Sequence, residues 1–175
     1  MSWEGYQKLE VSGSWLKPGF CIYLMDISHT DKRFFYIGMT GDPNYPSARA
    51  AFHRLSGHLE LTHHSTQNQL KTAFDQNNMR IEDCHITMHH FPIGGFTPWK
   101  LSSMKWEELN KYRTTPEYLA YKKHQQKVLQ LEKALIYTYS QQLGNRLLNR
   151  TKGKQYKTVL QDFKAMTEQL NTIIN

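Results

Sequence analysis

Two short runs of aromatic and aliphatic residues near the start of this 175-residue chain constrain its fold most strongly. Residues 20–25 read Phe-Cys-Ile-Tyr-Leu-Met and residues 33–38 read Arg-Phe-Phe-Tyr-Ile-Gly. Such residues favour strands, and the polar stretch between the runs is typical of a turn, so the pattern predicts a β-hairpin. A hairpin that turns symmetrically about His29 and Thr30 would place Tyr23 directly opposite Tyr36, with both phenols on one face.

The rest of the chain shows mainly helical periodicity around one further strand. Ser47 follows a turn-rich stretch and is a candidate N-cap, and Gly144 is a candidate C-cap. Residues from 92 to about 116 look irregular. The expected elements after the hairpin are a helix over 47–59, a helix over 66–76, a strand over 81–91, a long helix over 117–142 and a last helix over 156–174. This order indicates an α+β domain.

Composition narrows the class of protein. The formal charge of +7 and the pI near 9.4 point to a polyanionic partner, of which nucleic acid is the commonest. No apolar run approaches membrane-spanning length and the N-terminus does not resemble a signal peptide, so a cytoplasmic protein is expected. We expect one domain over 1–152, with an insertion at about 92–123, and a C-terminal helix over 153–175 packed on that same domain.

The helix expected over 47–59 carries two polar side chains that could serve a phosphate. At about 100° per residue, Arg54 and His58 lie one turn apart on the same flank of its apolar stripe. A guanidinium is a charged, forked donor that suits phosphate oxygens. The alternative is structural, with the Arg54 stem covering apolar surface and His58 closing an edge of the core.

Glu132 falls within or beside the inward stripe of the long helix. A carboxylate that faces inward is costly unless it is paired or binds a metal ion. A salt bridge, such as one to Arg54, would explain it. A Mg²⁺ site with a single carboxylate would explain it equally, since Mg²⁺ keeps waters and takes other ligands from substrate phosphate.

Tyr23 and Tyr36 have two readings as well. Most strand tyrosines are amphipathic core residues. A tyrosine beside a metal-bound water could instead act as a general base, but its ordinary pKa of about 10 means that it needs cationic neighbours to ionise near neutrality. The histidine pairs 63–64 and 89–90 lack a recognised zinc-ligand spacing, so zinc is not favoured.

Five segments together resemble, in order, the motifs of one nuclease family. The segments are Cys21-Ile22-Tyr23 with Tyr36-Ile37-Gly38, then Arg54 to His58, then His63-His64-Ser65-Thr66, then Glu132 with Leu135-Ile136, and finally Leu147-Leu148-Asn149. They are similar to the GIY and YIG strands, the Arg-x-x-x-His helix, the His-Ser element, the metal-binding Glu and the characteristic Asn of the GIY-YIG endonucleases. The resemblance implies a three-stranded antiparallel sheet flanked by helices, which agrees with the element order above.

The resemblance also implies a mechanism for cutting DNA. Glu132 would hold one Mg²⁺ or Mn²⁺ ion, which polarises the scissile phosphate and stabilises the leaving oxygen. Tyr23 would assist deprotonation of the attacking water, with Tyr36 beside it. Arg54 would stabilise charge on the pentavalent phosphorus, and the product would carry a 5′-phosphate.

The same resemblance assigns supporting roles and shows departures. His58 and His64 would position water or phosphate, and Asn149 would brace the site. The chain has Cys21 where Gly is usual. Met39 stands where a lysine or other polar residue often follows YIG, a loss that would weaken activation of the nucleophile.

Two further surfaces could contact nucleic acid. A basic run near Asn149 favours a role in tracking phosphates; it consists of Arg146, Arg150, Lys152, Lys154 and Lys157. The segment 96–123 mixes aromatic residues with lysines, and it is either a stacking surface or an insertion whose aromatics face the core. The main alternative to a nuclease is a catalytically silent nucleic-acid-binding module of the same fold. Such a module need not retain Tyr23, Arg54 and Glu132 together.

Overall fold

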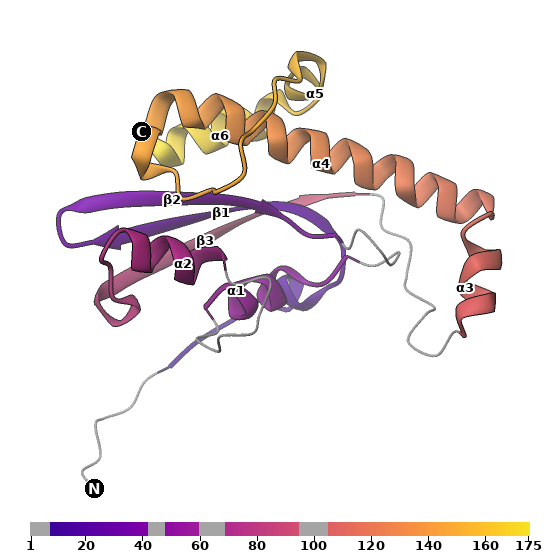
Figure 1. The fold of residues 1–175 in the computed structure, drawn as a ribbon, viewed down its shortest axis with the longest axis horizontal. Helices are drawn as coiled ribbons and strands as arrows, with labels where there is room; N and C mark the ends of the chain where they lie inside the picture. Colours follow the sequence, from indigo (N-terminus) through magenta and orange to yellow (C-terminus); the bar gives the residue numbers. More distant parts are fainter. Residues whose placement is uncertain (1–7, 42–47, 60–68, 95–104) are drawn as a thin grey trace, which may run out of the picture.

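The fold is a small antiparallel sheet with helices on both faces (Figure 1). The computed structural model describes residues 8–41, 48–59, 69–94 and 105–175. Strands β1 (Phe20–His29) and β2 (Lys32–Met39) form the hairpin, and β3 (Cys84–Ile93) pairs with the other side of β1. The strand order is β2-β1-β3 and all pairing is antiparallel. The prediction of an α+β chain with a three-stranded antiparallel sheet is therefore confirmed.

The hairpin register differs from the prediction by two residues. Tyr23 lies opposite Gly38, and Tyr36 lies opposite Met25, so the two tyrosines are not direct partners. The strands pair as far as His29 with Lys32, which leaves a two-residue turn in which Thr30 adopts a positive φ of 55°. Because side chains alternate with a period of two, this shift keeps both phenols on the same face.

Alternation along β1 divides the core into two layers, because this central strand is buried on both faces. Ile22 and Leu24 point toward the long helix α4 (Pro116–Leu143). Tyr23 and Met25 point toward the other layer, which contains helices α1 (Ala51–Leu59) and α2 (Gln69–Gln76). Figure 1 shows α4 on one side of the sheet and α1 with α2 on the other.

The long helix matches its expected bounds to within one residue at each end. Its N-terminus is capped by Thr115, whose hydroxyl accepts a hydrogen bond from the Tyr118 N–H at 3.2 Å. Pro116 occupies the first turn, where a missing N–H costs nothing. Gly144 is the C-cap with a φ of 55°, as predicted. Among the described residues, no helix is both long enough and apolar enough to cross a membrane.

Three expected elements before the long helix need correction. The helix expected over 47–59 begins only at Ala51, since residues 48–50 are not helical. The stretch before 116 is not wholly irregular, because α3 (Trp106–Tyr112) forms there with Glu108 capping the Lys105 N–H. The third strand begins only at Cys84, after a short 3-10 turn η2 (Ile81–Asp83). Two other short 3-10 turns, η1 (Gly13–Leu16) and η3 (Gly144–Arg146), were not expected. The N-cap candidate Ser47 lies outside the described residues.

The last expected helix is in fact two helices. The chain breaks at Phe163, with φ −119° and ψ 33°, between α5 (Lys157–Asp162) and α6 (Lys164–Ile174). The Phe163 ring packs toward α4, where the Lys127 ammonium lies 5.5 Å from its centre. Both helices join the core beneath α4, and the Tyr139 hydroxyl contacts Asn171 at 2.8 Å.

Candidate active site

A buried tyrosine and a buried histidine are directly hydrogen-bonded between the sheet and α1. The Tyr23 hydroxyl lies 2.7 Å from Nε2 of His58. The Tyr36 ring meets the His58 ring edge-on, with centroids 4.9 Å apart, and lies 6.4 Å from the Tyr23 ring. All three side chains are at least 94% buried, with exposures of 2%, 5% and 6% for Tyr23, His58 and Tyr36. Three residues that are far apart in sequence therefore form one aromatic and imidazole cluster.

Gly38 gives the Tyr23 ring the space that it needs. A Cβ atom at Gly38 would lie 2.3 Å from both Cζ and the hydroxyl of Tyr23, far inside contact distance. Glycine at this position allows the ring of the opposite residue to cross the backbone of β2. The glycine of the second motif thus sets where the Tyr23 hydroxyl meets His58.

Arg54 stands one turn before His58 on α1 and is partly buried. Its Nη2 donates a hydrogen bond to the carbonyl of Gly41 at 3.1 Å. Its charge lowers the pKa values of Tyr23, Tyr36 and Glu132, so the guanidinium lies within electrostatic reach of all three groups.

Glu132 approaches Arg54 and the end of β2 from α4, on the other face of the sheet. Burial raises the pKa of its carboxyl to about 7, although Arg54 and a hydrogen bond from the Met39 backbone both act to lower it. The same carboxylate raises the pKa values of Tyr23 and Tyr36. Arg54 thus acts on Glu132 electrostatically, and the raised pKa leaves the carboxyl partly neutral at pH 7.

The outer edge of β2 is covered by groups from the C-terminal half of the chain. The Leu148 N–H donates to the Phe35 carbonyl at 2.7 Å. Two residues along, the Asn149 amide accepts from the Ile37 N–H at 2.9 Å and donates to the Ile37 carbonyl at 2.7 Å. Two residues further, the backbone of Met39 bonds the Glu132 carboxylate. The side chains of Asn149 and Glu132 therefore contact Ile37 and Met39, two successive residues whose backbone groups face outward along the edge of β2.

The segment that follows β2 contains features that sequence reasoning missed. Thr40 is fully buried, and its hydroxyl donates to the Gly19 carbonyl at 2.6 Å and accepts from the Cys21 N–H at 2.8 Å. On one side of Thr40, the Met39 backbone is hydrogen-bonded to the Glu132 carboxylate. On the other side, the Gly41 carbonyl accepts a hydrogen bond from Arg54. A threonine beside a strand end carries no sequence signal that distinguishes this role from an ordinary turn residue.

Burial dominates the ionisation of both tyrosines. It raises the pKa of Tyr23 well above the ordinary value and also raises that of Tyr36, against the lowering effect of Arg54. The phenols are therefore neutral at pH 7. Any role of Tyr23 in moving protons must pass through its bond to His58 rather than through a standing phenolate.

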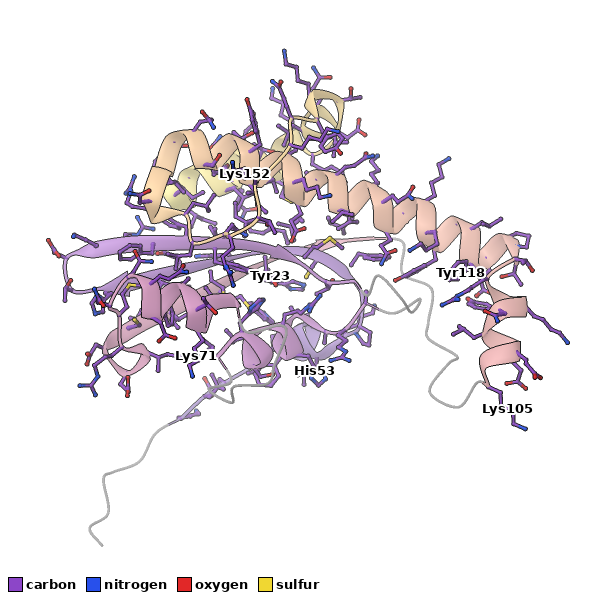
Figure 2. The ribbon with its side chains drawn as sticks, in the orientation of Figure 1. Tyr23, His53, Lys71, Lys105, Tyr118 and Lys152 are labelled. Carbon is purple, nitrogen blue, oxygen red and sulfur yellow. The ribbon has the colours of Figure 1, made fainter. Side chains whose placement is uncertain are left out.

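Other predicted site residues lie apart from this corner or cannot be described. His64 lies outside the described residues. The members of the basic run are exposed, and Lys152 lies on the α4 side of the sheet whereas Tyr23 lies toward the α1 side (Figure 2). Within the run, Lys154 lies against α4, where its N–H donates to the Lys133 carbonyl at 3.0 Å.

The aromatic residues near the start of α4 form a packed series. The Tyr112 and Tyr118 rings lie 5.8 Å apart, and Tyr118 leads on to the buried Tyr121 at 6.2 Å. Tyr121 contacts Phe20 of β1 at 5.4 Å. The series therefore faces the core at Tyr121. Tyr118, near the start of α4, lies far from Tyr23 of β1 (Figure 2).

No protein-family model, curated protein or solved structure matches this chain. Within the part that the structure describes, no group of three or more His, Cys, Asp or Glu side chains could together hold a metal ion. A metal site built from these described residues would therefore take at most two such side chains, with water or substrate oxygens as further ligands.

Proposed function

We propose that this protein is a divalent-metal-dependent endonuclease of the GIY-YIG type, which hydrolyses DNA phosphodiester bonds and leaves a 5′-phosphate. One observation carries the proposal. A Tyr–His hydrogen bond, an arginine and an inward carboxylate converge from both layers on one corner of the sheet. This collection of an acid–base pair, a phosphate-binding cation and a carboxylate suits phosphoryl chemistry.

Glu132 is the residue that would hold the metal ion. Its burial disfavours the charged carboxylate, and a divalent cation would compensate that cost directly. One carboxylate is enough for Mg²⁺ when waters and phosphate oxygens complete the shell. Bound there, the ion would supply positive charge to the scissile phosphate and the leaving oxygen.

The remaining roles follow from the chain's own contacts. Because the Tyr23 hydroxyl contacts Nε2 of His58, Tyr23 could take a proton from water while passing its own proton to the imidazole. That transfer avoids a free phenolate, which burial makes unfavourable. Arg54, held by the Gly41 carbonyl, would stabilise the extra negative charge that develops on phosphorus.

A second candidate is a catalytically silent nucleic-acid-binding module. Two observations favour it: burial makes both tyrosines hard to ionise, and the side chain after Gly38 is a methionine packed against the core rather than a lysine. Such a module would keep the basic surface and bind DNA without cutting.

Incubation of plasmid and branched DNA with the protein and Mg²⁺ or Mn²⁺ separates these candidates. We expect nicked or linear products whose ends can be ligated directly, because ligation requires a 5′-phosphate. We expect no product from Glu132→Ala, although this variant should still bind DNA. A wild-type protein that binds DNA yet cuts none of these substrates would leave only the silent module.

A further inference from the structure

A hollow of about 500 Å³ lies at the outer edge of β3, on the opposite side of the sheet from β2. Its volume is within the range of ordinary small-molecule sites. One wall is Trp15 of η1 and the other is α6, through Met166, Gln169 and Ile173. The edge of β3 around His90 forms the floor.

The lining combines flat rings, thioethers and hydrogen-bonding groups. The Trp15 and His90 rings are 5.1 Å apart and both are partly exposed. Burial lowers the pKa of His90, so its ring is neutral at pH 7. Met166 adds a polarisable thioether and Gln169 an exposed amide that can both donate and accept.

The backbone of β3 adds a donor and an acceptor to the floor. Cys21 exchanges hydrogen bonds with Thr40, on the β2 side of β1. Alternation then directs the backbone N–H and C=O of Ile22 toward β3, where the backbone groups of its partner Phe91 face β1. The N–H and C=O of His90 consequently face outward, and no strand among the described residues pairs with that edge.

This hollow lies across the sheet from the candidate active site, because the Tyr23 hydroxyl lies against Gly38 of β2. His90 lies opposite Tyr23 on β1, and Tyr23 lies opposite Gly38 on β2. Neighbouring strands are about 4.8 Å apart, so β3 lies roughly 10 Å from Gly38, a span that one or two nucleotides flanking a phosphate at the Tyr23 hydroxyl can cover. Trp15 itself packs against the same buried cluster as Tyr23.

We propose that this hollow binds the base of an unpaired nucleotide that flanks the phosphodiester bond to be cut. This inference rests on the proposed nuclease function and narrows its substrate to single-stranded or locally unpaired DNA. Flat rings stack on any base, and the Gln169 amide and β3 backbone can pair with the exposed base edge. The chain's charge of +7 suits a nucleic acid better than a neutral peptide strand at the same edge.

Binding without metal tests the proposal independently of cutting. Fluorescence anisotropy in EDTA would compare the Kd of a single strand of about 12 nucleotides with a series in which one position at a time lacks its base. We expect one position at which base removal weakens wild-type binding roughly ten-fold. With Trp15→Ala, and likewise with Gln169→Ala on the opposite wall, that ratio should fall toward one.

Two further variants separate base binding from a structural role of Trp15. Trp15→Phe keeps a flat ring and should give an intermediate ratio. Leu16→Ala changes an exposed neighbour in the same short turn and should keep the full ratio. A ratio near one at every position of the wild type, as expected if a peptide strand occupies the hollow or if DNA does not bind, overturns the proposal. So does a full ratio in Trp15→Ala. Cutting of plasmid DNA with a flat ratio would leave the nuclease intact and remove only this base site.

Discussion

At the scale of single residues, the hydrogen bond between Tyr23 and His58 depends on the glycine at position 38, which has no side chain. The Tyr23 ring fills the space where a Cβ of Gly38 would stand. The aromatic and glycine residues of the two motifs are evident from the sequence, but their fit is not. The fit of the Tyr23 ring over Gly38 depends on the register of the hairpin. That register is set by the turn at Thr30 and differs by two residues from that of a hairpin turning about His29 and Thr30.

Gly38→Ala should therefore displace the Tyr23 hydroxyl from His58. We expect a loss of roughly 1–3 kcal/mol in the free energy of unfolding, typical of overpacking, and a fall of at least ten-fold in cutting. Urea unfolding and a plasmid assay would measure both. Gly94→Ala is the matched control, because a Cβ at that position would meet no atom of the described residues within 4 Å beyond its chain neighbours. Equal stability and activity of the two variants would disprove the close fit.

Glu132 should make stability depend on pH. Its pKa is about 7 in the folded chain against an ordinary 4.5, so the folded state binds more protons between these values. Stability therefore falls as pH rises through this interval, and the cost persists above pH 7. Glu132→Gln should remove that slope and, at pH 8 in EDTA, raise Tm by several degrees, since about 1 kcal/mol corresponds to 2–4 °C in a domain of this size. A flat Tm profile of the wild type over this range would contradict the raised pKa of the Glu132 carboxyl.

At the scale of elements, the end of β2 and the two residues after it connect the two layers. The Met39 backbone is hydrogen-bonded to Glu132 of α4, and the Gly41 carbonyl accepts a hydrogen bond from Arg54 of α1. Between them, the Thr40 hydroxyl is hydrogen-bonded to the backbone at the start of β1. Strand and helix periodicity predicted the elements on either side, because burial leaves a repeating pattern. A single buried hydroxyl leaves no such pattern, and neither does the break at Phe163, whose ring turns toward α4.

Thr40→Val should test this connection. The substitution keeps the shape but leaves the Gly19 carbonyl and the Cys21 N–H without their buried partner, which costs about 1–3 kcal/mol. We expect a matching loss in urea unfolding and a lower kcat, because Glu132 and Arg54 are held by the adjoining residues. Thr40→Ser, which retains the hydroxyl, should recover most of both. Failure of serine to recover either quantity would mean that shape, not hydrogen bonding, matters here.

At the scale of the whole molecule, the core layer on the α4 side joins the N-terminal hairpin to the C-terminal helices. Arg33 of β2 forms an ion pair with Asp26 at 2.6 Å and also donates to the Ile173 carbonyl of α6 at 2.8 Å. Leu170 and Ile174 are buried beneath α4. The helical stripe of residues 156–174 was visible in the sequence, but only the structure reveals the surface that it covers.

Leu170→Ala should consequently destabilise the entire chain. We expect a loss of about 2–5 kcal/mol with a single cooperative transition, because a fully buried leucine is removed from the common core. Leu119→Ala, at a side chain that is 58% exposed, should change stability by less than about 0.5 kcal/mol. Two separate unfolding transitions, or an unaffected one, would show that α6 is an independent appendage.

The most direct test of the proposed activity is single-turnover cutting of DNA in Mg²⁺ by paired variants. Glu132→Gln and Tyr23→Phe should each cut at least about 100-fold more slowly than the wild type. Their controls on exposed positions of α4, Glu117→Gln and Tyr137→Phe, should cut within about two-fold of the wild type. Equal rates for Glu132→Gln and Glu117→Gln would contradict a metal-dependent cut centred on Glu132.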